Sequence, residues 1–297
     1  MRRAGLLLVV VLLTAAALGS RARAFRTTRD ETAYSFLTNP VAWPSRAPTL
    51  TLHEGGSDDL NEADALNAIH TAFATWTQPA CTNVAPSIAG TTTATLADGD
   101  GESVVAWRES DWAGLGYSPA EIAVTHMEYA QRTSTEWDLA GGDIALNGEN
   151  YTWVLEGGMP SSEFVDVQSI LTHEGGHFLG LMHACEIDGT HGAPICPALV
   201  PATAPTMWPG YFGQLERTLE RDDVDGICFL YPGPTVADGG VPADASTDDA
   251  GPAPPDSSAS SCGLTHERGG LPARTFFVAL IYMGFFLSRR RSTHARH

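Results

Sequence analysis

An α+β fold is predicted by four segments of the sequence. Residues 49–53 alternate polar and apolar side chains, as a strand with one buried face does. Residues 61–76 repeat apolar side chains three and four positions apart, which is the spacing of an amphipathic helix. Residues 120–129 are typical of another strand, and residues 222–229 of a short closing helix. We therefore expect helices packed against a sheet.

The first 24 residues have the features of an export signal. Two arginines precede an apolar run from Leu6 to Leu18, and Ala22-Arg23-Ala24 supplies the small residues that signal peptidase needs. The apolar run is too short for a comfortable membrane span. We expect cleavage before Phe25, and then an N-terminal strap or short pro-segment over residues 25–47.

Residues 48–232 are expected to form the one folded domain, beginning with the strand at 49–53 and the helix at 61–76. Residues 84–108 contain two further strand-like runs on either side of the stretch Asp98-Gly99-Asp100-Gly101-Glu102. Alternating Asp and Gly can hold calcium, yet Asp-Gly is also the commonest hairpin turn signal, so both interpretations stay open.

A helix that Asp166 is expected to cap carries a candidate metal site. His173 and His177 are four residues apart, so on a helix they share one face and can bind a single zinc ion. Glu174 would lie beside that metal, where a carboxylate can act as general base on zinc-bound water. This spacing predicts two ligands and a base.

A third ligand is predicted just beyond the helix. Gly180 tolerates the left-handed turn that ends a helix, and such a turn would return His183 to the same metal. Three protein ligands leave the fourth position of a tetrahedral zinc open for water, as catalytic sites require. The alternative is a helix that happens to carry three solvated or hydrogen-bonded histidines.

The stretch from His173 to His183 resembles the zinc signature of metzincin metalloproteases, and residues 206–211 resemble their Met-turn. Residues 222–227 are similar to the last helix of the matrixin branch. The resemblance is strongest over residues 165–232. It implies a metzincin-like fold with a twisted mixed β-sheet packed on an active-site helix and an N-terminal helix, and a small helical C-terminal subdomain after the zinc motif.

The resemblance also assigns roles to particular residues. Met207 is expected to form an apolar floor beneath the histidines without binding metal. Pro209 and Tyr211 are assigned to the wall of the pocket for the residue after the cut bond. Residues 141–147, followed by Trp153, are similar to the matrixin edge strand, whose backbone can pair with an extended substrate.

Several positions depart from the matrixin pattern. Where that family has ligands for a structural zinc and for calcium, this chain has Ala145, Asn147 and Asn150. A structural zinc is therefore not expected, and calcium is left open. No cysteine precedes Cys81, so the cysteine of a matrixin propeptide has no counterpart.

Cysteines of exported proteins usually pair. Cys185 and Cys196 bracket the loop between the third histidine and the Met-turn, so a bridge there would brace the underside of the site. Cys81 and Cys228 form the remaining candidate pair, and Cys262 is left over. Zinc binding by cysteines is the competing interpretation, but no CxxC spacing supports it.

The C-terminal part of the chain changes composition abruptly. Residues 233–261 are rich in Pro, Gly, Ala, Ser and Asp, which predicts a disordered linker. Residues 262–297 combine Cys262, an apolar run over 275–287 and three arginines, and they resemble the tripartite sorting signals of exported bacterial proteins, notably in myxobacteria. A weak membrane anchor with positive-inside arginines is the alternative.

The charge balance excludes one class of partner. The net charge of the whole chain is −18, and residues 25–262 hold 7 arginines against 34 acidic residues, a net charge of −27. So acidic a surface repels the phosphates of nucleic acids. We expect a monomer that contacts a membrane only through its C-terminal segment.

These features together predict an exported zinc-dependent endopeptidase that acts on extracellular proteins, either at the cell surface or secreted. One catalytic zinc is the expected cofactor, and protein or peptide substrates are the expected partners. The alternative is a non-catalytic surface-binding or adhesion module on the same fold.

Overall fold

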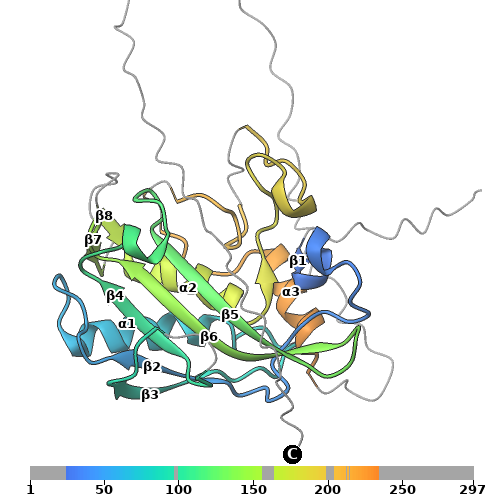
Figure 1. Cartoon of the computed structure of the whole chain (residues 1–297), viewed down its shortest axis with the longest axis horizontal. Coiled ribbons are helices and arrows are strands. Elements are labelled where there is room, and N and C mark those ends of the chain that lie inside the picture. Colours follow the sequence, from blue (N-terminus) through green and yellow to red (C-terminus); the bar gives the residue numbers. More distant parts are fainter. Residues whose placement is uncertain are drawn as a thin grey trace, which may run out of the picture.

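A mixed five-stranded sheet lies at the centre of the protein, which is described by a computed structural model (Figure 1). The described residues are 25–96, 100–155, 164–198, 204–211, 213 and 215–233. The strands, in their order across the sheet, are β3 (Ser87–Thr92), β2 (Thr49–His53), β4 (Val104–Arg108), β6 (Trp137–Asn147) and β5 (Ala123–Gln131). All run parallel except β5, which is antiparallel to β6.

Two helices cover one face of this sheet, and a third closes the fold. They are α1 (Glu62–Thr75), α2 (Val167–Phe178) and α3 (Arg221–Leu230). The remaining elements are short, and they are β1 (Arg26–Thr27), β7 (Thr152–Val154), β8 (Phe164–Asp166), β9 (Leu181–Met182), and the 3₁₀ turns at Thr28–Asp30, Thr32–Tyr34, Ala113–Leu115 and Thr190–Gly192. The mixed α+β architecture fits a metzincin-like fold.

Parts of the predicted organisation lie outside the described residues. These are the export signal over 1–24 and, from residue 234 onward, the linker and the C-terminal segment. Within the described part of the chain, no helix has both the length and the apolar character that crossing a membrane demands.

Helix α1 forms where the apolar spacing predicted it. The Asn61 side chain accepts a hydrogen bond from the backbone N–H of Asp64 (3.0 Å), which caps the first turn. Ile69 and Phe73 point into the core shared with Leu50 and Leu52 of β2. Just after α1, Trp76 donates its indole N–H to the carbonyl oxygen of Thr172 in α2 (2.8 Å), so the two helices are locked together.

The sheet excludes one open interpretation and contradicts one prediction. The runs at Ser87–Thr92 and Val104–Arg108 do not form the hairpin that the Asp-Gly turn signal left open, because β2 lies between them and pairs in parallel with both. The stretch 141–147 is not an edge strand either, because β6 is flanked by β4 and β5. Strand β5 is the edge of the sheet instead.

Residues 25–47 are bound into the domain as a strap. β1 pairs antiparallel with β9, and the Trp43 indole N–H donates to the carbonyl oxygen of Phe178 at the end of α2 (2.6 Å). The Tyr231 hydroxyl accepts from the Trp43 backbone N–H (3.1 Å) and donates to the Leu179 carbonyl (2.8 Å). The strap therefore lies against the end of the helix that carries the candidate site.

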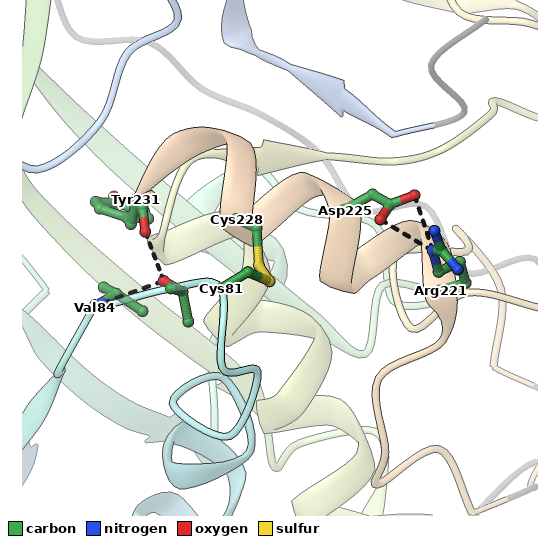
Figure 2. The surroundings of a disulfide bond; sticks show 7 residues. Cys81, Val84, Arg221, Asp225, Cys228 and Tyr231 are labelled. Atoms are coloured by element: carbon green, nitrogen blue, oxygen red, sulfur yellow. Dashed lines mark hydrogen bonds and ion pairs between the residues drawn. A yellow bond between two sulfur atoms is a disulfide. The ribbon is translucent and has the colours of Figure 1, made fainter. Parts of the chain in front are cut away.

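The disulfide between Cys81 and Cys228 joins the segment after α1 to α3 (Figure 2). Beside it, the Thr82 hydroxyl donates to the Tyr231 carbonyl (2.9 Å) and accepts from the Val84 backbone N–H (3.2 Å). The structure also contains the bridge between Cys185 and Cys196. Both pairings are those that the positions of the cysteines indicated.

Replacing Cys81 and Cys228 by serine is expected to lower the free energy of unfolding by about 2–5 kcal/mol, since the bridge closes a long loop and restricts the unfolded chain. The two cysteines are 147 residues apart, against 11 for Cys185 and Cys196. The matched control is the Cys185→Ser, Cys196→Ser variant, whose free energy of unfolding is expected to fall by less. Denaturant unfolding of the zinc-free chains measures both, and a larger loss in the control would contradict this account.

Candidate metal centre

Helix α2 places the first two histidines deep in the protein. Asp166 caps the helix by accepting a hydrogen bond from the backbone N–H of Ser169 (2.8 Å), which confirms the predicted cap. Glycines 175 and 176 face Trp76, and the absence of side chains there lets α1 approach closely. His173 and His177 lie one turn apart on the same face, and both are buried.

The chain reverses at Gly180 and brings in the third histidine. Gly180 has φ +99°, a left-handed conformation, and its N–H donates to the carbonyl oxygen of His177 (2.8 Å). A Cβ atom there would lie 2.7 Å from the carbonyl oxygen of Val41, so glycine is required on two grounds. The turn leads through β9 to His183, which is also buried.

The three imidazoles converge. One ligand atom from each of His173, His177 and His183 lies within 4.8 Å of the other two. The Nε2 atoms of His173 and His177 are 3.0 Å apart. Within the described residues, these three side chains form the one group of metal-binding residue types close enough to share an ion.

The Nδ1 atoms of all three imidazoles lie within hydrogen-bond distance of other protein atoms. Nδ1 of His173 lies 2.6 Å from the Thr206 carbonyl oxygen, and Nδ1 of His177 lies 2.8 Å from the Leu181 carbonyl oxygen. Nδ1 of His183 lies 2.8 Å from Oε1 of Glu186.

These acceptors fix where the ring protons are. A carbonyl oxygen can only accept, so Nδ1 carries the proton in His173 and His177, and each Nε2 presents a lone pair. Burial lowers the pKa of His173 to about 3 and that of His177 well below its ordinary value, so neither ring gains a second proton near neutral pH. Two lone pairs facing each other at 3.0 Å repel unless a cation lies between them.

A metal ion fits this donor set. Tetrahedral zinc with Zn–N bonds of about 2.0–2.1 Å holds neighbouring ligand nitrogens roughly 3.3 Å apart, close to the spacing of the Nε2 atoms. Imidazoles whose other nitrogen donates to a carbonyl or carboxylate are the usual arrangement around zinc. Three protein ligands also leave one position for water or substrate.

Glu174 lies beside the histidines and is fully buried. Its Oε2 atom accepts a hydrogen bond from the Thr125 hydroxyl of β5 (2.5 Å), whereas Oε1 has no hydrogen-bond partner among the described residues. Burial raises the pKa of Glu174 to about 8, and a cation bound by the histidines would lower that pKa by favouring the charged carboxylate. One carboxylate oxygen is thus anchored and the other is left to meet a ligand.

The turn at Met207 lies under the histidines. The Asp223 carboxylate accepts hydrogen bonds from the backbone N–H groups of Thr206 (2.7 Å) and Met207 (3.1 Å). Burial raises the pKa of Asp223 to about 6. Because the Thr206 carbonyl orients His173, this carboxylate of α3 indirectly supports the first ligand.

The residues assigned to a pocket wall lie farther into the protein than expected. Pro209 and Tyr211 are buried, and the Tyr211 hydroxyl accepts a hydrogen bond from the Asp166 backbone N–H (3.1 Å). Tyr211 therefore fastens the segment after Met207 to the start of α2. Their part in binding a substrate stays a prediction.

Sequence reasoning missed the groups that hold the ligands in place. Glu186 was detectable in principle, because it follows His183 by three residues. Thr125 lies on a distant strand, and the carbonyl oxygens of Thr206 and Leu181 belong to the backbone, so no side-chain pattern reveals them.

Comparison with known proteins finds a similarity to a metalloendoproteinase. No family model matches the chain. Residues of the chain are 26% identical over 214 positions to a protein of Arabidopsis thaliana described as metalloendoproteinase 5-MMP. The alignment covers 70% of this chain and spans about half the length of that relative. Together with the histidine cluster, this similarity points to zinc binding.

Gly176→Ala is expected to lower the free energy of unfolding by about 1–3 kcal/mol, because the core has no room for an added methyl group at this position. The new methyl would overlap Sδ of Met207 and lie 2.8 Å from Cζ2 of Trp76. Gly175→Ala is the matched control, since its methyl would lie 3.1 Å from the nearest atom, Nε1 of Trp76. Equal thermal stability of the two variants would show that this glycine is not needed for packing.

Proposed function

We propose that the protein is an exported zinc-dependent endopeptidase, with His173, His177 and His183 as zinc ligands and Glu174 as general base. One observation carries the proposal, namely the convergence of three imidazoles beside a buried carboxylate oxygen of Glu174 that has no hydrogen-bond partner among the described residues. Neither a structural histidine cluster nor a plain core helix needs that oxygen to be left unsatisfied.

The proposed reaction divides the work between the metal and the chain. Zinc bound there would supply a Lewis acid that polarises a peptide carbonyl and acidifies water. Oε1 of Glu174 takes the proton from the water that attacks the carbonyl carbon, and it then delivers that proton to the leaving amine as the C–N bond breaks. Thr125 holds Oε2 throughout, which keeps Oε1 aimed at the reacting atoms.

Strand β5 is the proposed platform for substrate. It pairs on one side only among the described strands, and Thr125 within it contacts Glu174. An extended peptide can add to such an edge by backbone hydrogen bonds, which would place its peptide bonds near the carboxylate. This arrangement favours protein or peptide substrates over small molecules.

Export is part of the same proposal. The signal-like residues 1–24 and the two disulfides suit a protein that folds outside the cytoplasm. Residues 262–297 are proposed to tether it to the cell surface or to direct its sorting.

Glu174→Ala is expected to reduce cleavage of casein or gelatin by about 100- to 10,000-fold, because the general base is lost while all three imidazoles remain. Zinc content, measured by atomic emission, is expected to stay at one per chain. Glu62→Ala, on the exposed side of α1, serves as the matched control and is expected to cleave normally. Undiminished proteolysis by the Glu174 variant would refute the assignment, and a zinc-loaded parent without proteolysis would favour the adhesion module.

Removing the metal with a chelator is expected to abolish cleavage and to lower the melting temperature, because an ion that binds only the folded chain stabilises it by about 4 kcal/mol at a thousandfold excess over its dissociation constant. Zinc added back restores both properties, whereas calcium alone restores neither. Cleavage that continues in a chain shown by metal analysis to be free of zinc would contradict the proposal.

A further inference from the structure

The strap at the N-terminus of the described chain reaches the metal centre through β9. β1 pairs with β9 so that Arg26 lies opposite Met182 and Thr27 opposite Leu181. β9 has two duties at the site, since the Leu181 carbonyl orients His177 and the next residue after β9 is the third ligand, His183. Strand pairing alone therefore places the strap one residue from a ligand.

The side chain of Arg26 continues this contact. Its Nη1 donates to the backbone carbonyl of His183 (3.2 Å), and its Nη2 donates to the carbonyl of His191 (3.2 Å) and to Oε1 of Glu31 (2.8 Å). The residue is only 5% exposed. A single planar guanidinium thus joins the third ligand, the loop beyond it and a carboxylate of the strap.

The loop held by Arg26 is the one that orients His183. The bridge between Cys185 and Cys196 closes this loop, and Glu186 within it binds Nδ1 of His183 (2.8 Å). His191, also within it, places its Nδ1 3.3 Å from Oε2 of Glu31. Arg26 and Glu31 together therefore contact both the backbone of His183 and the loop that orients its ring.

The turn between Arg26 and Glu31 is built to present the carboxylate. The side chain of Asp30 accepts hydrogen bonds from the backbone N–H (2.8 Å) and the hydroxyl (2.9 Å) of Thr27, which closes a 3₁₀ turn. That turn brings Glu31 back against the guanidinium. Arg26 and Glu31 form a buried ion pair, so truncating one of them would leave the charge of the other buried without a partner.

We propose that Arg26 is a positioning residue of the metal centre, fixing the third ligand and its orienting loop so that His183 meets the metal already in place. The inference rests on the proposed zinc site. It also gives the strap a role at the proposed site, since the guanidinium contacts the backbone of His183.

The test is the zinc affinity of the full chain, measured by competition with a chromophoric chelator at a temperature well below unfolding. Arg26→Ala is expected to bind zinc about tenfold more weakly, the scale of effect seen when support outside the ligand shell is lost. Arg26→Lys, which keeps the charge but cannot bridge three acceptors, is expected to recover part of the affinity. Glu31→Gln, of the same size as the native residue, is expected to weaken binding less than Arg26→Ala.

Two controls separate positioning from general stability. Arg29→Ala alters an exposed arginine of the same strap and is expected to leave zinc affinity unchanged. Leu37→Ala removes an apolar strap side chain from a buried cluster that includes Met182 but none of the three histidines, so it is expected to lower the melting temperature without changing the affinity. In the cobalt-loaded chain, the visible absorption bands are expected to shift for Arg26→Ala and not for Leu37→Ala.

Each outcome has a distinct meaning. Equal zinc affinities and cobalt spectra for the parent, Arg26→Ala and Arg26→Lys, with proteolysis intact in the parent, would overturn the role of Arg26 and leave the proposed function standing. A loss of affinity in Leu37→Ala as large as in Arg26→Ala would also overturn it. A parent chain that binds no zinc would instead overturn the proposed function.

Discussion

The arrangement of this site depends on the two Nε2 atoms of His173 and His177, which face each other 3.0 Å apart. In each ring the proton is on Nδ1, which donates it to a backbone carbonyl on the far side of the ring. Such a pair is electrostatically unfavourable in a buried, low-dielectric setting and becomes favourable when a cation accepts both lone pairs. That repulsion explains the features around the pair. The turn at Gly180 brings in a third imidazole, and Glu174 adds a carboxylate beside the same position. The fold holds the histidines in an arrangement that a bound metal ion would stabilise.

Each of the three histidines is held by a different part of the chain. His173 is oriented by a carbonyl of the Met-turn, which the Asp223 carboxylate of α3 fixes in turn. His177 is oriented by β9, which is paired with the N-terminal strap. His183 is oriented by Glu186 on a disulfide-closed loop. Segments far apart in the sequence thus meet around the three rings, and the stability of the whole fold supports their geometry.

Local sequence patterns predicted individual helices and strands, but they did not predict which strands pair with each other. The strand at Thr49–His53 was predicted residue for residue, and α1 to within a residue at each end, because alternation, helical spacing and the Asn61 cap are local signals. The grouping of the histidines followed from their spacing around Gly180. The order of the strands did not, since nothing within 141–147 records which neighbours a strand pairs with, and the edge was assigned to β6 instead of β5. Thr125 and Arg26 were missed for the same reason.

Zinc K-edge X-ray absorption of the purified, zinc-loaded chain tests the central claim most directly, because it counts and identifies the atoms bound to the metal. The account predicts three imidazole nitrogens and one further light atom at about 2.0–2.1 Å, with no sulfur. A sulfur shell near 2.3 Å, or fewer than three imidazoles, would contradict it.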